Sequence, residues 1–342
     1  MKYIIISARQ RLFANLTASI AVFGYCLSLI LTPAIADAQS ANEKKDATYR
    51  IGFHLWKPGK IYDEAMAGIE DGLALEGIVY EKVVLQSHRD KSMAEKNLRT
   101  LDSMGLNLIF SLSSAGTKIA NTIGMQTPVI ATVVNHPTSL GVNQKNAKSP
   151  TNLTGTSYYV DTTKQMQFYQ SLFPKLTKIG MIYDKNNPAG ALAEEPFMRH
   201  TCQQFHLEFL SVRVENEGEI AEATTELINA DVNIIVIPTN RLVYKSVQVI
   251  FDLAREHNIP VVSMNKQGVE YGALAGLFAD TYKLGRYTTP MAKQILNAKN
   301  GAKHLPFTFI PKPDIIVNLK AAKALNYEFP ADILGKAAIV LQ

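Results

Sequence analysis

The sequence is poor in cysteine, with two in 342 residues. Cys26 lies in an N-terminal segment that we expect to be removed on export, which leaves Cys202 as the one thiol of the mature chain. A single thiol cannot form an internal disulfide, so the fold must depend on its hydrophobic core. About 300 mature residues are enough for two lobes of ordinary domain size, each with its own core.

Long hydrophobic runs, low-complexity segments and an excess of one charge are also lacking beyond the N-terminus. No later run reaches the roughly 20 apolar residues of a membrane-spanning helix. The formal charge of +5 falls to +3 when the leader is subtracted with its charged residues Lys2, Arg9, Arg11 and Asp37. Because this charge is small and dispersed, we expect no nucleic acid partner.

Motifs of known catalytic chemistry are absent as well. There is no G-x-S-x-G, no P-loop and no H-E-x-x-H. Five of the histidines show no spacing typical of metal ligands: His88, His200, His206, His257 and His304. We therefore expect neither an enzyme nor a metal or other cofactor.

The first 38 residues have the order of a secretory signal peptide. Basic residues come first, at Lys2, Arg9 and Arg11. The run from Leu16 to Leu31 is apolar except for small polar residues, and two overlapping A-x-A triplets follow between Ala34 and Ala38. This order predicts export of a soluble protein to the periplasm through a cleaved signal peptide, residues 1–38.

Two alternatives to a cleaved leader are an uncleaved anchor and a lipoprotein. The apolar run is short for a membrane-spanning helix and a cleavable tripeptide follows it directly, which favours cleavage. Cys26 follows Phe23, Gly24 and Tyr25, whose sizes do not fit a lipid-attachment box. We expect the mature chain to begin near Asp37 or Gln39.

From Tyr49 onward, short β-branched runs alternate with longer stretches of helical periodicity. The expected strands are Arg50–Leu55, Glu81–Gln86, Leu108–Leu112, Val129–Val134, Leu153–Tyr158, Lys178–Tyr183, Glu208–Val214, Ile234–Pro238, Pro260–Met264 and Ala273–Phe278. The expected helices are Tyr62–Leu75, Ser92–Met104, Ala115–Ile123, Gly190–Phe205, Glu217–Asn229, Leu242–Glu256 and Tyr282–Asn297. This alternation predicts an α/β fold of two doubly wound parallel-sheet lobes, whose ligands lie beyond the carboxyl ends of the strands.

In the first half, three strands are followed by candidate ligand-binding residues. Ser113, Ser114 and Thr117 surround the start of a helix, where hydroxyl and backbone N–H groups could bind an anionic group. The alternative is simple N-capping by Ser113 or Ser114. Asn135 follows the next strand, and Tyr158 stands at the expected junction of the lobes, where it either stacks on a ligand or packs in the hinge.

In the second half, six polar residues occupy the equivalent places after strands: Asp184, Asn187, Thr239, Asn240, Asn265 and Asp280. Asparagine and aspartate are also the residues that turns and helix caps favour, so each residue alone is weak evidence for a binding site. Their shared position at the carboxyl ends of the strands indicates a ligand cleft.

The ordered motifs of the mature chain resemble one known family. They are Asn152-Leu153-Thr154-Gly155, the strand Lys178–Tyr183, Ile237-Pro238-Thr239, Ile259–Val262, Tyr271–Ala275, Leu284-Gly285-Arg286 and Val317–Leu325. In this order and spacing the chain is similar to the substrate-binding proteins of the ABC transporter family that includes tryptophan and tyrosine binders, with the type I periplasmic-binding fold.

The resemblance implies two lobes joined by three crossovers, near Ser157–Asp161, Phe278–Tyr282 and Leu305–Phe309. The first lobe would comprise residues 47–157 plus 281–305 and the second 158–280 plus 306–342. It also implies a small-molecule ligand, no cofactor, an ABC permease as partner, and a monomer.

Three places that carry carboxylates in the family are neutral or basic here: Pro238-Thr239-Asn240-Arg241, Asn265-Lys266-Gln267 and His136-Pro137. An amino acid ligand needs an anionic partner for its ammonium. Among the residues that follow strands, Asp184 and Asp280 are the remaining candidates for this anionic partner. Alternatively, the ligand is an anion bound by Arg241, Lys266 and the helix start at 113–117.

Two functions of different class follow from the resemblance. The first is a periplasmic solute-binding protein of an ABC importer, which binds a small polar or aromatic molecule, with amino acids among the candidates. The second is a ligand-sensing protein that docks on a membrane receptor kinase or cyclase. An exported enzyme is disfavoured, because no acid, base and nucleophile converge in a motif.

Overall fold

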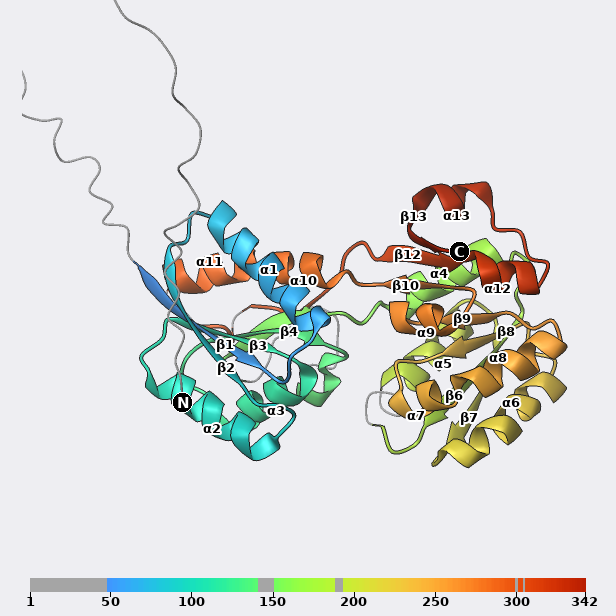
Figure 1. Cartoon of the computed structure of the whole chain (residues 1–342), viewed down its shortest axis with the longest axis horizontal. Helices are drawn as coiled ribbons and strands as arrows, with labels where there is room; N and C mark the ends of the chain where they lie inside the picture. Colours follow the sequence, from blue (N-terminus) through green and yellow to red (C-terminus); the bar gives the residue numbers. More distant parts are fainter. Residues whose placement is uncertain (1–47, 141–150, 188–192, 299–300, 304) are drawn as a thin grey trace, which may run out of the picture.

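The alternating apolar runs form two separate β-sheets, seen as two lobes in the computed structural model (Figure 1). The structure describes residues 48–140, 151–187, 193–298, 301–303 and 305–342, so the expected signal peptide lies outside the described residues. The fold is the α/β class predicted from the sequence, with two mostly parallel sheets and helices on both faces of each.

The first sheet is parallel throughout and has the strand order β11-β5-β4-β3-β1-β2. Its strands are β1 (Tyr49–Leu55), β2 (Tyr80–Gln86), β3 (Leu108–Leu112), β4 (Val129–Val134), β5 (Leu153–Ser157) and β11 (Thr308–Phe309). The helices of this lobe are α1 (Lys60–Leu75), α2 (Lys91–Ser103), α3 (Ser114–Ile123), α10 (Thr281–Tyr287) and α11 (Thr289–Ala298), with a short 3-10 turn η1 (Pro137–Leu140).

Alternate residues of the central strands are buried on opposite faces of the first sheet. Phe53 and Phe110 pack under α1 and α11, with ring centroids 5.2 Å apart, whereas Ile109 packs under α2 and α3. Since successive side chains of a strand point to opposite faces, both faces of a sheet covered by helices must be apolar. The near-continuous hydrophobic runs of β3 and β4 follow from this burial.

The second sheet has the strand order β13-β12-β10-β9-β8-β6-β7, in which β10 and β12 are antiparallel and the other pairs are parallel. Its strands are β6 (Lys178–Asp184), β7 (Glu208–Val214), β8 (Ile234–Ile237), β9 (Val261–Ser263), β10 (Ala275–Phe278), β12 (Asp314–Asn318) and β13 (Ala337–Leu341). The helices are α4 (Thr162–Leu172), α5 (Glu195–Gln204), α6 (Ile220–Asn229), α7 (Arg241–Lys245), α8 (Val247–Glu256), α9 (Lys266–Tyr271), α12 (Leu319–Ala324) and α13 (Ala331–Lys336), with the 3-10 turn η3 (Glu217–Glu219).

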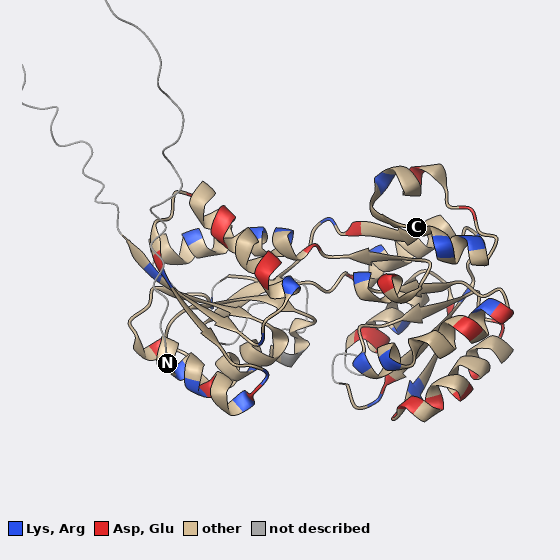
Figure 2. Cartoon of the chain, in the orientation of Figure 1, with Lys and Arg blue, Asp and Glu red and all other residues tan. Residues whose placement is uncertain are grey.

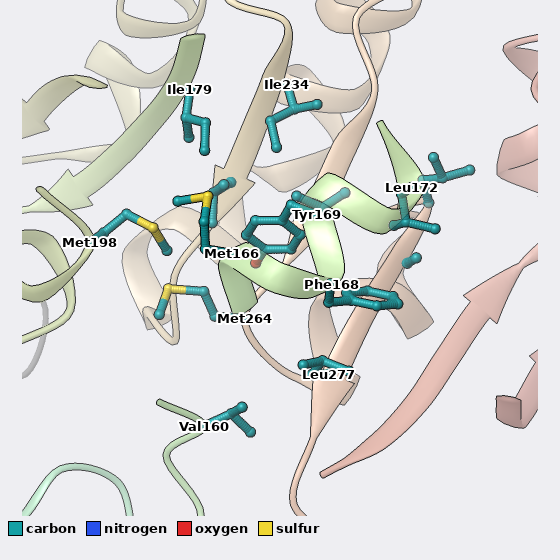
Figure 3. Packing of buried hydrophobic residues seen from close by; sticks show 14 of the residues in the cluster. Val160, Met166, Phe168, Tyr169, Leu172, Ile179, Met198, Ile234, Met264 and Leu277 are labelled. Carbon is teal, nitrogen blue, oxygen red and sulfur yellow. The ribbon is translucent and has the colours of Figure 1, made fainter. Parts of the chain in front are cut away.

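Helix α4 contributes several large apolar side chains to the core of the second lobe. Met166, Phe168 and Tyr169 of α4 pack against Ile179 of β6 and Ile234 of β8 in one buried cluster (Figure 3). The opposite face of the sheet is covered by α6 and α8. Each lobe therefore has a core of its own, as expected for a chain long enough to form two domains of ordinary size.

Three segments carry the chain between the lobes: one after β5, one between β10 and α10, and one between β11 and β12. The first two lie where the sequence placed them. The third lies later than predicted, because Thr308 and Phe309 pair with Thr156 and Ser157 of β5. Residues 308–309 therefore belong to the first sheet and not to the second lobe, to which the sequence analysis assigned residues 306–342.

Several helix boundaries differ from the expected ones. The stretch 242–256 divides into α7 and α8 at Ser246, and 282–297 divides into α10 and α11 at Thr288. Part of the expected helix 190–205 lies outside the described residues. Within the described ranges, no helix is both long and apolar enough to cross a membrane.

Candidate ligand cleft between the lobes

A cavity of about 520 Å³ lies where the two lobes meet. The first lobe contributes Lys60, Ile61 and Glu64 from the start of α1. The second lobe contributes Thr239 and the start of α9, and the crossovers contribute Tyr158 and the segment 278–281. This volume lies within the range of roughly 300–1,000 Å³ that is usual for small-molecule sites.

Four of the predicted site residues line this cavity: Tyr158, Thr239, Asn265 and Asp280. Asn265 ends the connection after β9; its Oδ1 accepts a hydrogen bond from Gly268 N (3.2 Å), and its Nδ2 donates to Thr239 Oγ1 (2.9 Å). The same Asn265 amide donates to the hydroxyl of Tyr244. The amide, the threonine and the tyrosine form one polar network at the wall of the cavity.

Aromatic rings form the apolar part of the same wall. Tyr158 lies on the first crossover, Phe278 ends β10, and Tyr271 ends α9 with its ring edge-on to Tyr244 at 5.6 Å. Burial, the charge of Glu194 and the neighbouring Tyr62 raise the pKa of the Tyr158 hydroxyl, so this group stays neutral and can donate a hydrogen bond. Rings beside amides suit a ligand that is part aromatic and part polar.

The charged residues of the cavity are largely paired with one another. Lys60 lies 3.6 Å from Glu64, and Lys266 lies 3.5 Å from Glu270. Asp280 Oδ1 accepts from Lys283 N (2.8 Å) and so caps α10. Arg241 is exposed and lies outside the lining. Acidic and basic residues are interspersed along the helices of both lobes (Figure 2).

The predicted residues around α3 stabilise the start of that helix. Ser113 Oγ accepts from Gly116 N (2.9 Å), and Thr117 Oγ1 donates to Ser111 Oγ (3.0 Å). Ser114 Oγ accepts from Asn135 N (2.9 Å), which joins α3 to the end of β4. None of these four predicted residues lines the cavity, so the structure matches the capping alternative for Ser113.

The other three predicted residues of the second lobe also lie outside the lining of the cavity. Asp184 Oδ1 accepts from Asn186 N (2.8 Å), and Asn187 N donates to the Asp184 carbonyl oxygen (3.2 Å), so both belong to one turn after β6. Asn240 is buried and caps α7 through a hydrogen bond from Leu242 N (2.8 Å). These are the roles that asparagine and aspartate commonly have in turns and caps.

Glu194 is the residue near this site that the sequence analysis missed. It is fully buried, its Oε2 accepts from Thr239 N (3.1 Å), and its Oε1 accepts from Asn135 Nδ2 (3.4 Å). Burial raises the pKa of its carboxyl, while the hydrogen bonds from Thr239 and Asn135 act in the opposite direction. Glu194 does not directly follow a strand but comes later, just before α5, so its position after β6 does not mark it as a candidate.

The region between the lobes beside Glu194, which we call the neck, contains packed rings from both lobes. His136, which follows Asn135, lies 4.8 Å from the ring of Tyr159 and 5.0 Å from that of Phe197. Burial lowers the pKa of His136 to about 4, so its imidazole is neutral near pH 7. His136 thus serves as a packing residue.

A second cavity of about 600 Å³ lies between the α10–α11 helices and the third crossover. Its walls include Leu284, Tyr287 and Met291, together with residues 305–306 and 308–311. None of the predicted site residues lines it. Among the described residues, no group of three or more histidine, cysteine, aspartate or glutamate side chains could hold a metal ion.

Two α/β lobes joined by three crossovers, with a cavity between them, define the class of type I periplasmic-binding folds. A family model described as ABC transporter substrate binding protein matches residues 58–341. The chain therefore belongs to the ABC transporter substrate-binding protein family, as its motifs predicted, and is a solute-binding protein and not an enzyme.

Individual relatives agree with this assignment. A tyrosine-binding protein of Clostridioides difficile (strain R20291) is 26% identical over 222 residues, which are 65% of this chain and 64% of the relative's length. The ligand-free, open structure of a Clostridium difficile substrate-binding protein with adhesive properties has a TM-score of 0.76 at 24% identity, over 86% of this chain and 100% of that one. A Streptococcus pneumoniae ABC domain in complex with L-Trp has a TM-score of 0.64 at 22% identity, over 85% of this chain and 100% of that one.

Proposed function

We propose that this protein is the exported solute-binding component of an ABC importer and that it binds a small aromatic amino acid between its lobes. The observation that carries the proposal is the cavity at the neck, where Tyr158, Thr239 and Asn265 combine rings, hydroxyls and an amide. Relatives described as binding tyrosine and L-Trp support an aromatic amino acid as the first ligand to test.

The binding residues that we propose are Tyr158, Thr239, Asn265 and Asp280, which line the cavity from the crossovers and the second lobe. A ligand held by both lobes would favour their closed arrangement, since it contacts both surfaces only when they approach. Closure is the signal that we propose an ABC permease recognises. Export is supported by the order of basic, apolar and small residues in 1–38.

A thermal-shift screen of residues 39–342 against amino acids, purines, organic acids and sugars tests the ligand class. A ligand present at 100 times its Kd adds about 2.7 kcal/mol to stability. We expect the largest shifts with L-tyrosine or L-tryptophan. Stabilisation by sugars or purines alone would contradict the proposed ligand class, and no stabilisation by any compound would contradict the binding role.

Export is tested separately, by mass spectrometry of the protein recovered from the periplasm. We expect a chain that begins near Asp37 or Gln39. Recovery of the uncleaved chain from the inner membrane would contradict the proposed leader.

A further inference from the structure

Glu194 is a buried carboxylate with no cationic partner among the residues that the structure describes. Its side chain is fully buried, and among the described residues no lysine, arginine or histidine lies within 4.0 Å of it. Its two hydrogen bonds come from neutral donors, Thr239 N and Asn135 Nδ2. An ionised carboxylate in such a place is costly unless a positive charge compensates it.

Asn135 carries a second group that has no partner in the described part of the chain. Its side chain is 8% exposed, and its Oδ1 accepts no hydrogen bond, although its Nδ2 lies 3.4 Å from Glu194 Oε1. The Asn135 backbone is fixed by hydrogen bonds with Ser114 Oγ and Ser157 Oγ, so the amide is held beside the carboxylate. An unsatisfied buried acceptor in a folded protein calls for an explanation.

Among the described residues, the Glu194 carboxylate has no cationic partner and Asn135 Oδ1 has no hydrogen-bond donor. Glu194 belongs to the second lobe and Asn135 to the first, and Asn135 Nδ2 lies 3.4 Å from Glu194 Oε1. An ammonium group has three N–H donors and one positive charge, which fits an amide oxygen and a carboxylate together. We propose that Glu194, with Asn135 Oδ1 as second acceptor, binds the ammonium group of the ligand; this inference rests on the proposed function.

The position of Glu194 relative to the cavity supports this role. Thr239, whose backbone N–H binds Glu194 Oε2, lines the cavity, and so does Tyr158, whose pKa the Glu194 charge helps to raise. The carboxylate thus lies directly behind the wall that these two residues form. Binding of the ammonium requires this wall to open between Tyr158 and Thr239 as the lobes close.

Glu194 supplies a carboxylate beside Thr239, where the next residue in the chain is neutral. The position after Thr239 is Asn240, which caps α7, but the Glu194 carboxylate is bound to Thr239 itself. Asp280 is the competing candidate. Its carboxylate is already engaged by the N-terminus of α10, and its charge acts on the ammonium of Lys283.

The proposal predicts a charge-specific effect of Glu194→Gln, which keeps the shape of the side chain. Isothermal titration of residues 39–342 would compare L-tyrosine with 3-(4-hydroxyphenyl)propanoate, which lacks only the ammonium group. We expect wild type to prefer L-tyrosine by at least about 30-fold, and Glu194→Gln to lose that preference, because a buried ammonium would lack its counter-charge. Affinity for the deaminated compound should not fall.

Glu195→Gln is the matched control, since it removes one negative charge from the adjacent position. Glu195 hydrogen-bonds Arg199 and Ser211, away from Asn135, so L-tyrosine affinity should stay within about threefold of wild type. If Glu194→Gln is unfolded by circular dichroism, Asn135→Ala tests the same site: it removes the second acceptor and should lower the preference for L-tyrosine, and an unchanged preference would overturn the proposal.

Several outcomes would overturn the inference. Unchanged L-tyrosine affinity in Glu194→Gln would do so, as would loss of the preference in Asp280→Asn with retention in Glu194→Gln. A wild-type protein that binds both compounds equally, or that binds only ligands without an amine, would overturn the ammonium site and leave the binding-protein role intact. A protein that binds nothing in the screen would overturn the proposed function together with the inference.

Discussion

Gly285 of α10 lies directly against the backbone of α1 at Ala65. A Cβ atom at position 285 would be 2.1 Å from the Ala65 carbonyl oxygen, and one at Gly68 would be 2.0 Å from that of Tyr282. Both distances are far below van der Waals contact, so each glycine is required for the approach of the two helices. Since α10 directly follows the second crossover, this contact fixes where that crossover enters the first lobe.

We predict that Gly285→Ala destabilises the protein by roughly 1–3 kcal/mol, because the helices must separate to admit the methyl group. Chemical denaturation of residues 39–342 would measure the loss. Gly335→Ala is the control, since a Cβ at position 335 of α13 meets nothing within 4 Å and alanine favours a helix. Equal stability of Gly285→Ala and wild type would contradict the close packing.

Tyr158 is predicted to contribute to binding through its ring. Tyr158→Ala should weaken L-tyrosine or L-tryptophan binding by about tenfold or more, because an aromatic contact is lost. Tyr158→Phe keeps the ring and should stay closer to wild type. Titration calorimetry measures both variants, and an alanine variant that binds as tightly as wild type would exclude Tyr158 from the site.

His54 makes the stability of the first lobe depend on pH. It is fully buried, its Nε2 lies 2.8 Å from Ser87 Oγ, and its Nδ1 has no partner. Burial lowers its pKa from 6.5 to about 4. The folded protein thus binds fewer protons than the unfolded chain in this interval, and the stability present above pH 6.5 is lost as the pH falls towards 4.

The size of this effect is roughly 3 kcal/mol from the pKa shift. Urea unfolding at pH 7 and pH 4.5 would measure it, with His54→Gln for comparison. The variant should lose less stability than wild type between the two pH values, whatever its stability at pH 7. An equal loss in both proteins would show that His54 does not titrate in this interval.

The thiol of Cys202 is predicted to be unreactive in the native protein. Its side chain is fully buried in α5, and burial raises the pKa of its thiol to about 12. The thiolate, which is the reactive form, is therefore scarce at pH 7 to 8. Reaction with a thiol reagent should follow global unfolding in denaturant, and rapid labelling of the native protein would contradict this burial.

The sequence was sufficient to predict two sheets of mostly parallel strands, since the runs of β3 and β4 are apolar on both faces as helix-covered strands must be. The strands β12 and β13, and the antiparallel pairing of β10 with β12, were not predicted. It did not predict β11, because Thr308 and Phe309 form a strand only by pairing with β5. Breaks at Ser246 and Thr288 were missed because the apolar periodicity continues through them.

The site was harder to predict than the fold. Thr239 and Asn265 could be found because the carboxyl ends of parallel strands meet at one edge. Asn240 also follows a strand and also carries an amide, yet its side chain caps α7 and does not line the cavity. The local backbone determines this difference, and the sequence pattern does not reveal it. Glu194 could not be found by this rule, since its place beside Asn135 depends on a contact between the lobes across 59 residues of sequence.

The location of the ligand is the central claim, and a crystal structure of residues 39–342 with the best ligand of the screen tests it most directly. We predict that the ligand lies between the lobes, against Tyr158, Thr239 and Asn265, in the cavity of about 520 Å³. A ligand found instead in the cavity of about 600 Å³ beside Leu284 and Tyr287, with the cleft empty, would contradict it.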